Sequence, residues 1–132
     1  MDAEFPTTKI AAVESHKRGM KVLMGAPNLV RGGSHSGNIA AHELAHTGVL
    51  DILSSDYYPA SMLHAAFILE GLDNDYDLPK AIRTVTKNPA AATKLNDRGE
   101  LAIGMRADLV QVNDDDEFPL VRQVWQQGIR VF

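Results

Sequence analysis

The sequence predicts an α/β protein built on a parallel sheet. Short apolar runs, typical of buried strands, alternate along the chain with longer segments of helical periodicity. The helical segments are bounded by threonine, proline and glycine, which commonly begin or end helices. The chain has 132 residues, of which 45% are hydrophobic and 23% charged, and these values suit one soluble domain with a modest core.

The first half of the chain supplies the clearest alternation of strands and helices. Thr7 or Thr8 can cap its first helix, which Gly19 can end, and Ser36 or Asn38 can cap its second helix. The expected elements are an extended segment at 3–6, a helix at 7–19, a strand at 20–25, a glycine-rich loop at 26–38, a helix at 39–48 and a strand at 49–55.

The second half is mostly helical and then changes character. Pro59 can lie in the first turn of the helix that follows it. The expected elements are helices at 60–72, 78–88 and 89–96, and strands at 106–113 and 120–132 around the acidic loop 114–117. In a parallel sheet, ligands bind beyond the carboxyl ends of the strands. Two loops there qualify as sites, residues 26–38 and residues 54–60.

Residues 42–46 read HELAH, which matches the H-E-x-x-H pattern of zinc metalloproteases. A helix turns by about 100° per residue, so Ala41 and Leu44 share one face while His42 and His46 lie on the other. In a βαβ unit the small apolar face packs on the sheet, and both histidines should then face solvent. A zinc protease is therefore a remote alternative.

The loop at 26–38 contains the stretch LVRGGSHSGN. Its glycines permit close backbone approach, so N–H groups can point at an anion, and Arg31 adds a forked charged donor. His35 can donate a hydrogen bond, transfer a proton or bind a metal. The alternative is a loop whose glycines only make turns. The candidate phosphate-binding residues are Arg31, Gly32, Gly33, Ser34, His35, Ser36 and Asn38.

Asp56 follows the apolar run LDILSS directly. A carboxylate at the end of a strand can ligate a metal, act as a base on a metal-bound water, or simply cap the next helix. The sequence leaves these roles open. Asp56 is the candidate catalytic residue, and Asp56 and His35 are the candidate metal ligands.

Composition excludes several classes of partner. The net charge is −4 and the basic residues form no stripe, which argues against nucleic acid. The longest apolar run is too short to span a bilayer, so we expect no membrane partner. The chain has no cysteine and its amino-terminal residues lack the layout of a signal peptide. These features predict a cytoplasmic protein.

The stretch NPAAATKLNDRGELAIGMRADLVQV, residues 88–112, resembles the C-terminal hallmark of amidohydrolase-superfamily enzymes. The residues that match its layout are Gly99, Gly104, Ala107, Asp108 and Leu109. Upstream, the stretches EFPTT, MGAPNLVRGGSHSGN and LDILSSDYYPASMLHAAF resemble the phosphonate-metabolism branch of that superfamily, the PhnM family.

This resemblance implies a fold and an activity. Residues 1–98 would be the C-terminal part of a TIM-like (β/α) barrel, about strands six to eight, and residues 99–132 would add short strands of a β-sandwich. The family's reaction is the release of diphosphate from ribose 1-methylphosphonate 5-triphosphate, a phosphorylated small molecule. By position, Asp56 would be the strand-eight aspartate that contacts the metal and activates water. The loop at 26–38 would face the phosphates.

The family uses zinc or another divalent metal, but most of its metal ligands have no counterpart here. We therefore expect no tightly bound metal and little activity in this chain alone, because one carboxylate does not hold a catalytic metal against water. The alternative is a non-catalytic module that oligomerises or binds phosphate-like anions. Unpaired strands at both edges of the partial barrel predict a homo-oligomer that covers them.

Overall fold

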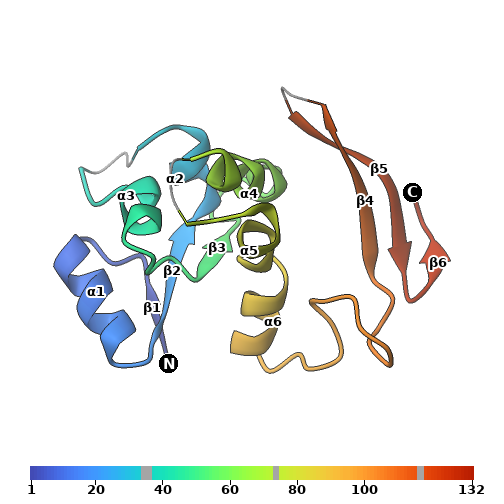
Figure 1. Ribbon diagram of the computed structural model, residues 1–132, viewed down its shortest axis with the longest axis horizontal. Coiled ribbons are helices and arrows are strands. Elements are labelled where there is room, and N and C mark those ends of the chain that lie inside the picture. Colours follow the sequence, from blue (N-terminus) through green and yellow to red (C-terminus); the bar gives the residue numbers. More distant parts are fainter. Residues whose placement is uncertain (34–36, 73–74, 116–117) are drawn as a thin grey trace.

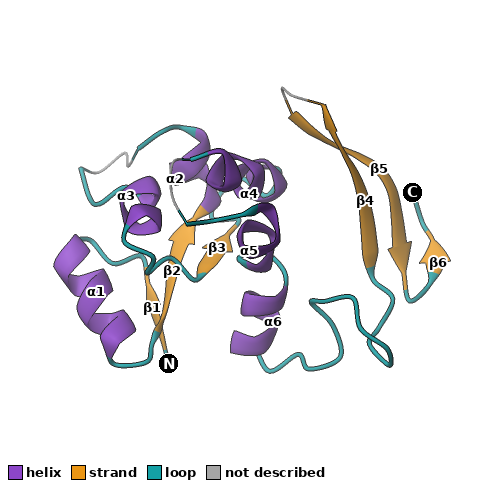
Figure 2. Cartoon of the chain, in the orientation of Figure 1, coloured by secondary structure: helices purple, strands orange, loops and turns teal. Residues whose placement is uncertain are grey.

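The computed structural model describes residues 1–33, 37–72, 75–115 and 118–132. The described strands form two three-stranded sheets; the first lies among the helices and the second extends to one side (Figures 1 and 2). In chain order the elements are β1 (Asp2–Glu4), α1 (Lys9–Lys17), β2 (Lys21–Gly25), α2 (Ala26–Val30), α3 (Ala41–His46), β3 (Ile52–Ser54), α4 (Ser61–Gly71), α5 (Leu78–Arg83), α6 (Lys87–Ala92), β4 (Leu109–Asp115), β5 (Phe118–Gln126) and β6 (Ile129–Arg130).

The first sheet is parallel, as the sequence predicts, with the order β1-β2-β3. In the view of Figure 1, α1 and α3 lie to the left of this sheet, and α4, α5 and α6 lie to its right. The central strand β2 carries Val22 and Met24 into the core, where they are almost fully buried. The core also takes its apolar side chains from the flanking helices and from β3, notably Ala12, Leu29, Leu44, Leu53, Ala65 and Leu69.

Helix α1 begins as the sequence predicts. The hydroxyl of Thr8 accepts a hydrogen bond from the N–H of Ala11, at 3.2 Å, which satisfies one of the free donors of the first turn. After the helix, Gly19 adopts a left-handed φ of 78°, a conformation that glycine tolerates without strain.

The segment expected to be a continuous loop at 26–38 instead begins with helix α2. Pro27 lies in its first turn, where the missing N–H and the fixed φ of proline favour helix formation. The glycines of this segment indicate a loop, but apolar residues precede them and form the helix. Ala26, Pro27 and Leu29 are buried, and tertiary packing therefore stabilises this short helix.

The predicted cap of the next helix is also wrong. Helix α3 has Ala40 at its N-cap position, not Asn38, and Ser36 lies outside the described residues. The N–H of Ala41 donates to Oδ1 of Asn28, at 2.8 Å. A side chain of α2 thus caps α3 across space, an arrangement that local sequence patterns do not show.

The orientation predicted for the HELAH helix is confirmed. Leu44 and Ala45 are almost fully buried, whereas His46 is exposed and His42 half-buried. The hydroxyl of Thr47 donates to the Leu44 carbonyl at 2.8 Å and closes the end of the helix. The histidine face of α3 therefore points away from the core.

The outer edge of β3 is partly covered by the chain itself, although the sequence led us to expect an open edge. The N–H of Leu53 donates to the Thr84 carbonyl at 3.1 Å. The side-chain amide of Asn88 donates to the Asp51 carbonyl at 2.8 Å. The break between α5 and α6 falls at residues 84–86, earlier than the predicted break between residues 88 and 89.

The second sheet is antiparallel, with the order β4-β5-β6. The single strand expected at 120–132 is in fact two strands, and β4 continues to Asp115, into the segment expected to be a loop. Gln127 and Gly128 have φ values of 52° and 80° and form the two-residue turn between β5 and β6. The Asp108 carboxylate supports this turn by accepting from the N–H of Gln127 at 2.9 Å.

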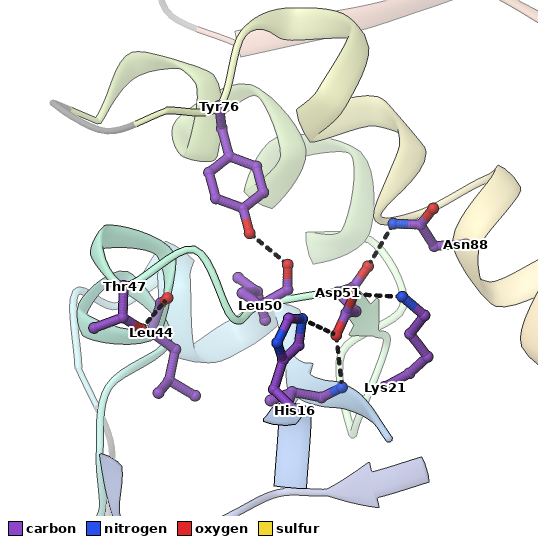
Figure 3. Close-up of polar contacts among 9 residues, drawn as sticks. His16, Lys21, Leu44, Thr47, Leu50, Asp51, Tyr76 and Asn88 are labelled. Carbon is purple, nitrogen blue, oxygen red and sulfur yellow. Dashed lines mark hydrogen bonds and ion pairs between the residues drawn. The ribbon is translucent and has the colours of Figure 1, made fainter. Parts of the chain in front are cut away.

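A polar cluster ties the elements together at the amino ends of β2 and β3 (Figure 3). Oδ1 of Asp51 accepts from the Lys21 ammonium at 2.9 Å, and Oδ2 accepts from the N–H of Val22 at 3.0 Å. His16 is partly exposed, and its Nε2 lies 3.5 Å from Asp51 Oδ2. This cluster lies at the opposite end of the strands from the predicted site.

Candidate functional site

A cavity of about 240 Å³ lies at the carboxyl ends of the three parallel strands. Phe5 follows β1, Met24 belongs to β2 and Asp56 follows β3, so each strand contributes a lining residue. The remaining lining residues come from the chain around these ends: Pro6, Pro27, Asn28, Arg31, Gly33, Asn38, Ile39 and Tyr57. This is the edge of the sheet at which the sequence predicts ligand binding.

The cavity brings together several of the residues singled out in the sequence. Arg31, Gly33, Asn38 and Asp56 all line it. Gly32 is not among the lining residues and has a left-handed φ of 74°. Ser34, His35 and Ser36 lie outside the described residues.

The two adjacent glycines close the end of helix α2. The N–H of Gly32 donates to the Leu29 carbonyl at 3.1 Å, and the N–H of Gly33 donates to the Asn28 carbonyl at 3.0 Å. This pair of bonds is the Schellman arrangement, which requires the left-handed conformation that Gly32 adopts. Both N–H groups are thus engaged within the chain, which differs from the anion-facing arrangement expected from the sequence.

Arg31 supplies the positive charge of the cavity. It is the C-cap residue of α2, and its guanidinium carbon lies 5.1 Å from the centroid of the Tyr57 ring. A guanidinium over an aromatic face is attracted by the ring electrons, at an exposed site by about 0.5–1 kcal/mol. Tyr57 therefore helps to hold the guanidinium at the cavity wall, a role that the sequence did not suggest.

Two non-glycine residues of the cavity have left-handed backbone conformations. Phe5 and Asp56 both have a φ of 49°, which is rare for residues with a side chain and costly for a bulky one. From the sequence we expected sites only in the loops at 26–38 and 54–60, and Phe5 belongs to neither. Phe5 directly follows β1, and residues that follow parallel strands meet at one edge of the sheet, so its position was the available signal.

The arrangement places opposite charges in one cavity. The Asp56 carboxylate can accept a proton or ligate a cation, and the Arg31 fork matches the oxygens of a phosphate. Across residues 1–33, 37–72, 75–115 and 118–132 no group of three His, Asp or Glu side chains is placed to hold a metal ion. The Asp56 carboxylate can be one oxygen ligand of a metal ion. The described residues do not supply the further ligands that a metal centre needs.

Three parallel strands flanked by helices, with a charged cavity at their carboxyl ends, define an α/β protein of the kind that supplies enzyme active sites. Residues 20–132 match the sequence pattern of the Amidohydrolase family. The chain belongs to this family.

Relatives agree with this assignment. Over 131 residues the chain is 60% identical to the alpha-D-ribose 1-methylphosphonate 5-triphosphate diphosphatase of Escherichia coli (strain K12), which confirms the resemblance to the PhnM family. The match covers 98% of this chain but 35% of that protein, so the chain spans about a third of the length of this relative. It is also 43% identical over 61 residues to the imidazolonepropionase of Deinococcus deserti, covering 40% of this chain and 15% of that protein.

A solved structure supports the fold. An amidohydrolase from Thermotoga maritima MSB8 superimposes with a TM-score of 0.62 at 16% sequence identity, covering 100% of this chain and 43% of that one. At this identity the likeness concerns the fold alone. Among the helices of the described residues, none has both the length and the apolar character that crossing a membrane requires.

Proposed function

We propose that this chain forms the C-terminal part of the active site of a phosphonate-metabolism hydrolase, which releases diphosphate from ribose 1-methylphosphonate 5-triphosphate. The observation that carries this proposal is the cavity that Arg31 and Asp56 share at the carboxyl ends of three parallel strands. The printed name of the Escherichia coli relative supports the substrate. In this proposal β1, β2 and β3 are barrel strands six, seven and eight, and residues 99–132 belong to a β-sandwich.

Asp56 has the central chemical role in this proposal. Enzymes of this family are generally metal-dependent, and zinc or another divalent ion would supply a Lewis acid at the reacting phosphate. Asp56 would be a ligand of that ion, and its carboxylate would accept a proton from the attacking water. His35, which lies outside the described residues, is the second proposed ligand.

The phosphates of the substrate bind at Arg31, which lines the same cavity as Asp56. Because the N–H groups of Gly32 and Gly33 are engaged at the end of α2, side chains make the main contacts. Arg31 donates to phosphate oxygens from its position against Tyr57. Asn38 adds an amide, and Ser34 and Ser36 are the further proposed donors.

The isolated chain is proposed to have little activity of its own. It spans 35% of its Escherichia coli relative, and its described residues place one carboxylate in the cavity. The second candidate function is a non-catalytic module that binds phosphate-like anions or oligomerises. The hydrolase and the anion-binding module both require anion binding at Arg31, and they differ in whether diphosphate is released.

Inorganic phosphate tests whether the cavity binds anions at Arg31. At ten times its Kd, phosphate should stabilise the folded chain by about 1.4 kcal/mol and raise Tm by a few degrees. Arg31→Ala should lose most of this increase, because it removes the charged donor of the cavity. Arg83→Ala, which removes an exposed arginine of α5, is the matched control and should keep it. Differential scanning calorimetry measures all three proteins, and an equal phosphate effect in Arg31→Ala would refute the proposed phosphate contact.

A further inference from the structure

The last residue of β2 lies directly against the side chain of Asp56. A methyl group built on Gly25 would lie 2.8 Å from Oδ2 of Asp56, 3.2 Å from its Cβ and 3.4 Å from its Cγ. The three nearest atoms all belong to this one residue. The first distance is shorter than the separations that side-chain carbons have in proteins, so any side chain at Gly25 would compete with the carboxylate for space.

The backbone of Gly25 does not itself require glycine. Its φ is −73° and its ψ is 131°, an extended conformation that any residue adopts. The residue is buried, and it is paired in register with Ser54 of β3. Space, not conformation, is therefore the reason why glycine fits this position.

The carboxylate of Asp56 is thus held from two directions. Its own left-handed φ of 49° turns the chain back after β3, and the bare surface of Gly25 receives the side chain. We propose that Gly25 is the positioning residue for Asp56, since the missing side chain lets the carboxylate lie against the end of β2 within the cavity. This inference rests on the proposed function, in which Asp56 contacts the metal and activates water.

The test is Gly25→Ala in the full chain. The closest atom is the free end of a side chain, so the variant should fold while its methyl group displaces the carboxylate. Gly71→Ala is the matched control, because Gly71 ends α4 with nothing within 4 Å of an added Cβ.

The first readout is the carboxyl carbon signal of Asp56 by ¹³C NMR at constant pH, identified by its loss in Asp56→Asn. The second is broadening of the amide signals of residues 25 and 56 by added Mn²⁺, which detects weak binding.

We expect the Asp56 carboxyl signal to move in Gly25→Ala and to stay in place in Gly71→Ala. The Mn²⁺ concentration for half-maximal broadening should rise roughly tenfold in Gly25→Ala, as for other residues that orient a metal ligand. An unmoved carboxyl signal would overturn the positioning role. If Mn²⁺ broadens no amide signal in the wild type, the proposed metal contact of Asp56 is wrong. The shift of the Asp56 carboxyl signal still tests whether Gly25 positions Asp56.

A second variant covers the case in which Gly25→Ala does not fold. The double variant Gly25→Ala with Asp56→Gly removes the competing side chain and places glycine at the left-handed position. If the clash with Asp56 is the cause, the double variant folds where Gly25→Ala does not. If it is no more stable than Gly25→Ala, the two residues are not coupled and the inference fails.

Discussion

Tyr76 is a buried polar residue whose ionisation is strongly disfavoured. Its side chain is 3% exposed, and its hydroxyl donates to the Leu50 carbonyl. Burial, together with the nearby Asp51 carboxylate, raises the pKa of Tyr76 to about 12. In the unfolded chain a tyrosine has a pKa of about 10.

This pKa difference predicts a loss of stability in alkali. Between about pH 10 and pH 12 the unfolded chain loses the Tyr76 proton while the folded chain keeps it, so the free energy of unfolding falls as the pH rises. Below pH 10 this contribution is fully present. Urea unfolding from pH 8 to pH 11 should show a steeper decline for the wild type than for Tyr76→Phe. Tyr58→Phe, at an exposed tyrosine, should decline like the wild type; equal slopes in all three would contradict the assignment.

The cavity residues show how far single positions can be predicted. Asp56 and Arg31 were identified because they follow strands in a pattern that predicts a parallel sheet, and both line the cavity. Phe5 was missed because β1 is short and its end is less evident in the sequence. Asn28 was missed because its amide caps a helix thirteen residues away, a contact that depends on tertiary packing.

At the scale of elements, Asp51 lies in a short loop but contacts several helices and strands. Its carboxylate contacts β2 through Lys21 and the N–H of Val22, and contacts α1 through His16. Its carbonyl accepts from Asn88 of α6 (Figure 3). The side chain is 12% exposed, so these contacts are only partly screened by water.

Removing this carboxylate should loosen the packing of α1 and β2. Asp51→Ala leaves the N–H of Val22 and the Lys21 ammonium without their partner, and should lower the free energy of unfolding by about 2 kcal/mol. Urea denaturation monitored by circular dichroism measures the change. Glu14→Ala, which breaks an exposed ion pair with Lys17, is the control and should leave stability almost unchanged. A similarly small effect in both variants would show that Asp51 does not tie these elements together.

The elements were predicted unevenly, for physical reasons. The strands of the first sheet and helices α1, α3 and α4 follow the apolar periodicity, although their ends shift by one to a few residues. Helix α2 was missed because packing, not propensity, stabilises five residues that precede two glycines. The tail was expected as one strand because nothing but Gly128 marks its turn, and the turn also depends on the distant Asp108.

At the scale of the whole molecule, the chain leaves apolar surface and a strand edge unpaired. Strand β1 lies at the edge of its sheet, and large apolar side chains of the second sheet are exposed. The most exposed apolar residues of this sheet and of the two residues that follow it are Val110, Phe118, Ile129, Val131 and Phe132. The division into residues 1–98 and 99–132 stays a prediction at this scale.

These surfaces predict a homo-oligomer. Pairing the β1 edge or covering the apolar side chains removes both from water, and a second copy of the chain is the partner always present. Size-exclusion chromatography with light scattering should give a mass well above the 14.4 kDa of one chain at micromolar concentration. A mass of one chain across the concentration range would refute this prediction.

The cover over β3 limits how such an assembly grows. Thr84 already bonds to Leu53 of β3 and Asn88 to Asp51 just before it, so a neighbour cannot add a strand there without displacing them. Within the part of the chain that the structure describes, the β1 edge of the parallel sheet is therefore the one without such a cover. Two copies that join through β1 use both available edges, and a third finds none. Through this sheet the chain can form a closed pair, but it cannot extend into a fibre.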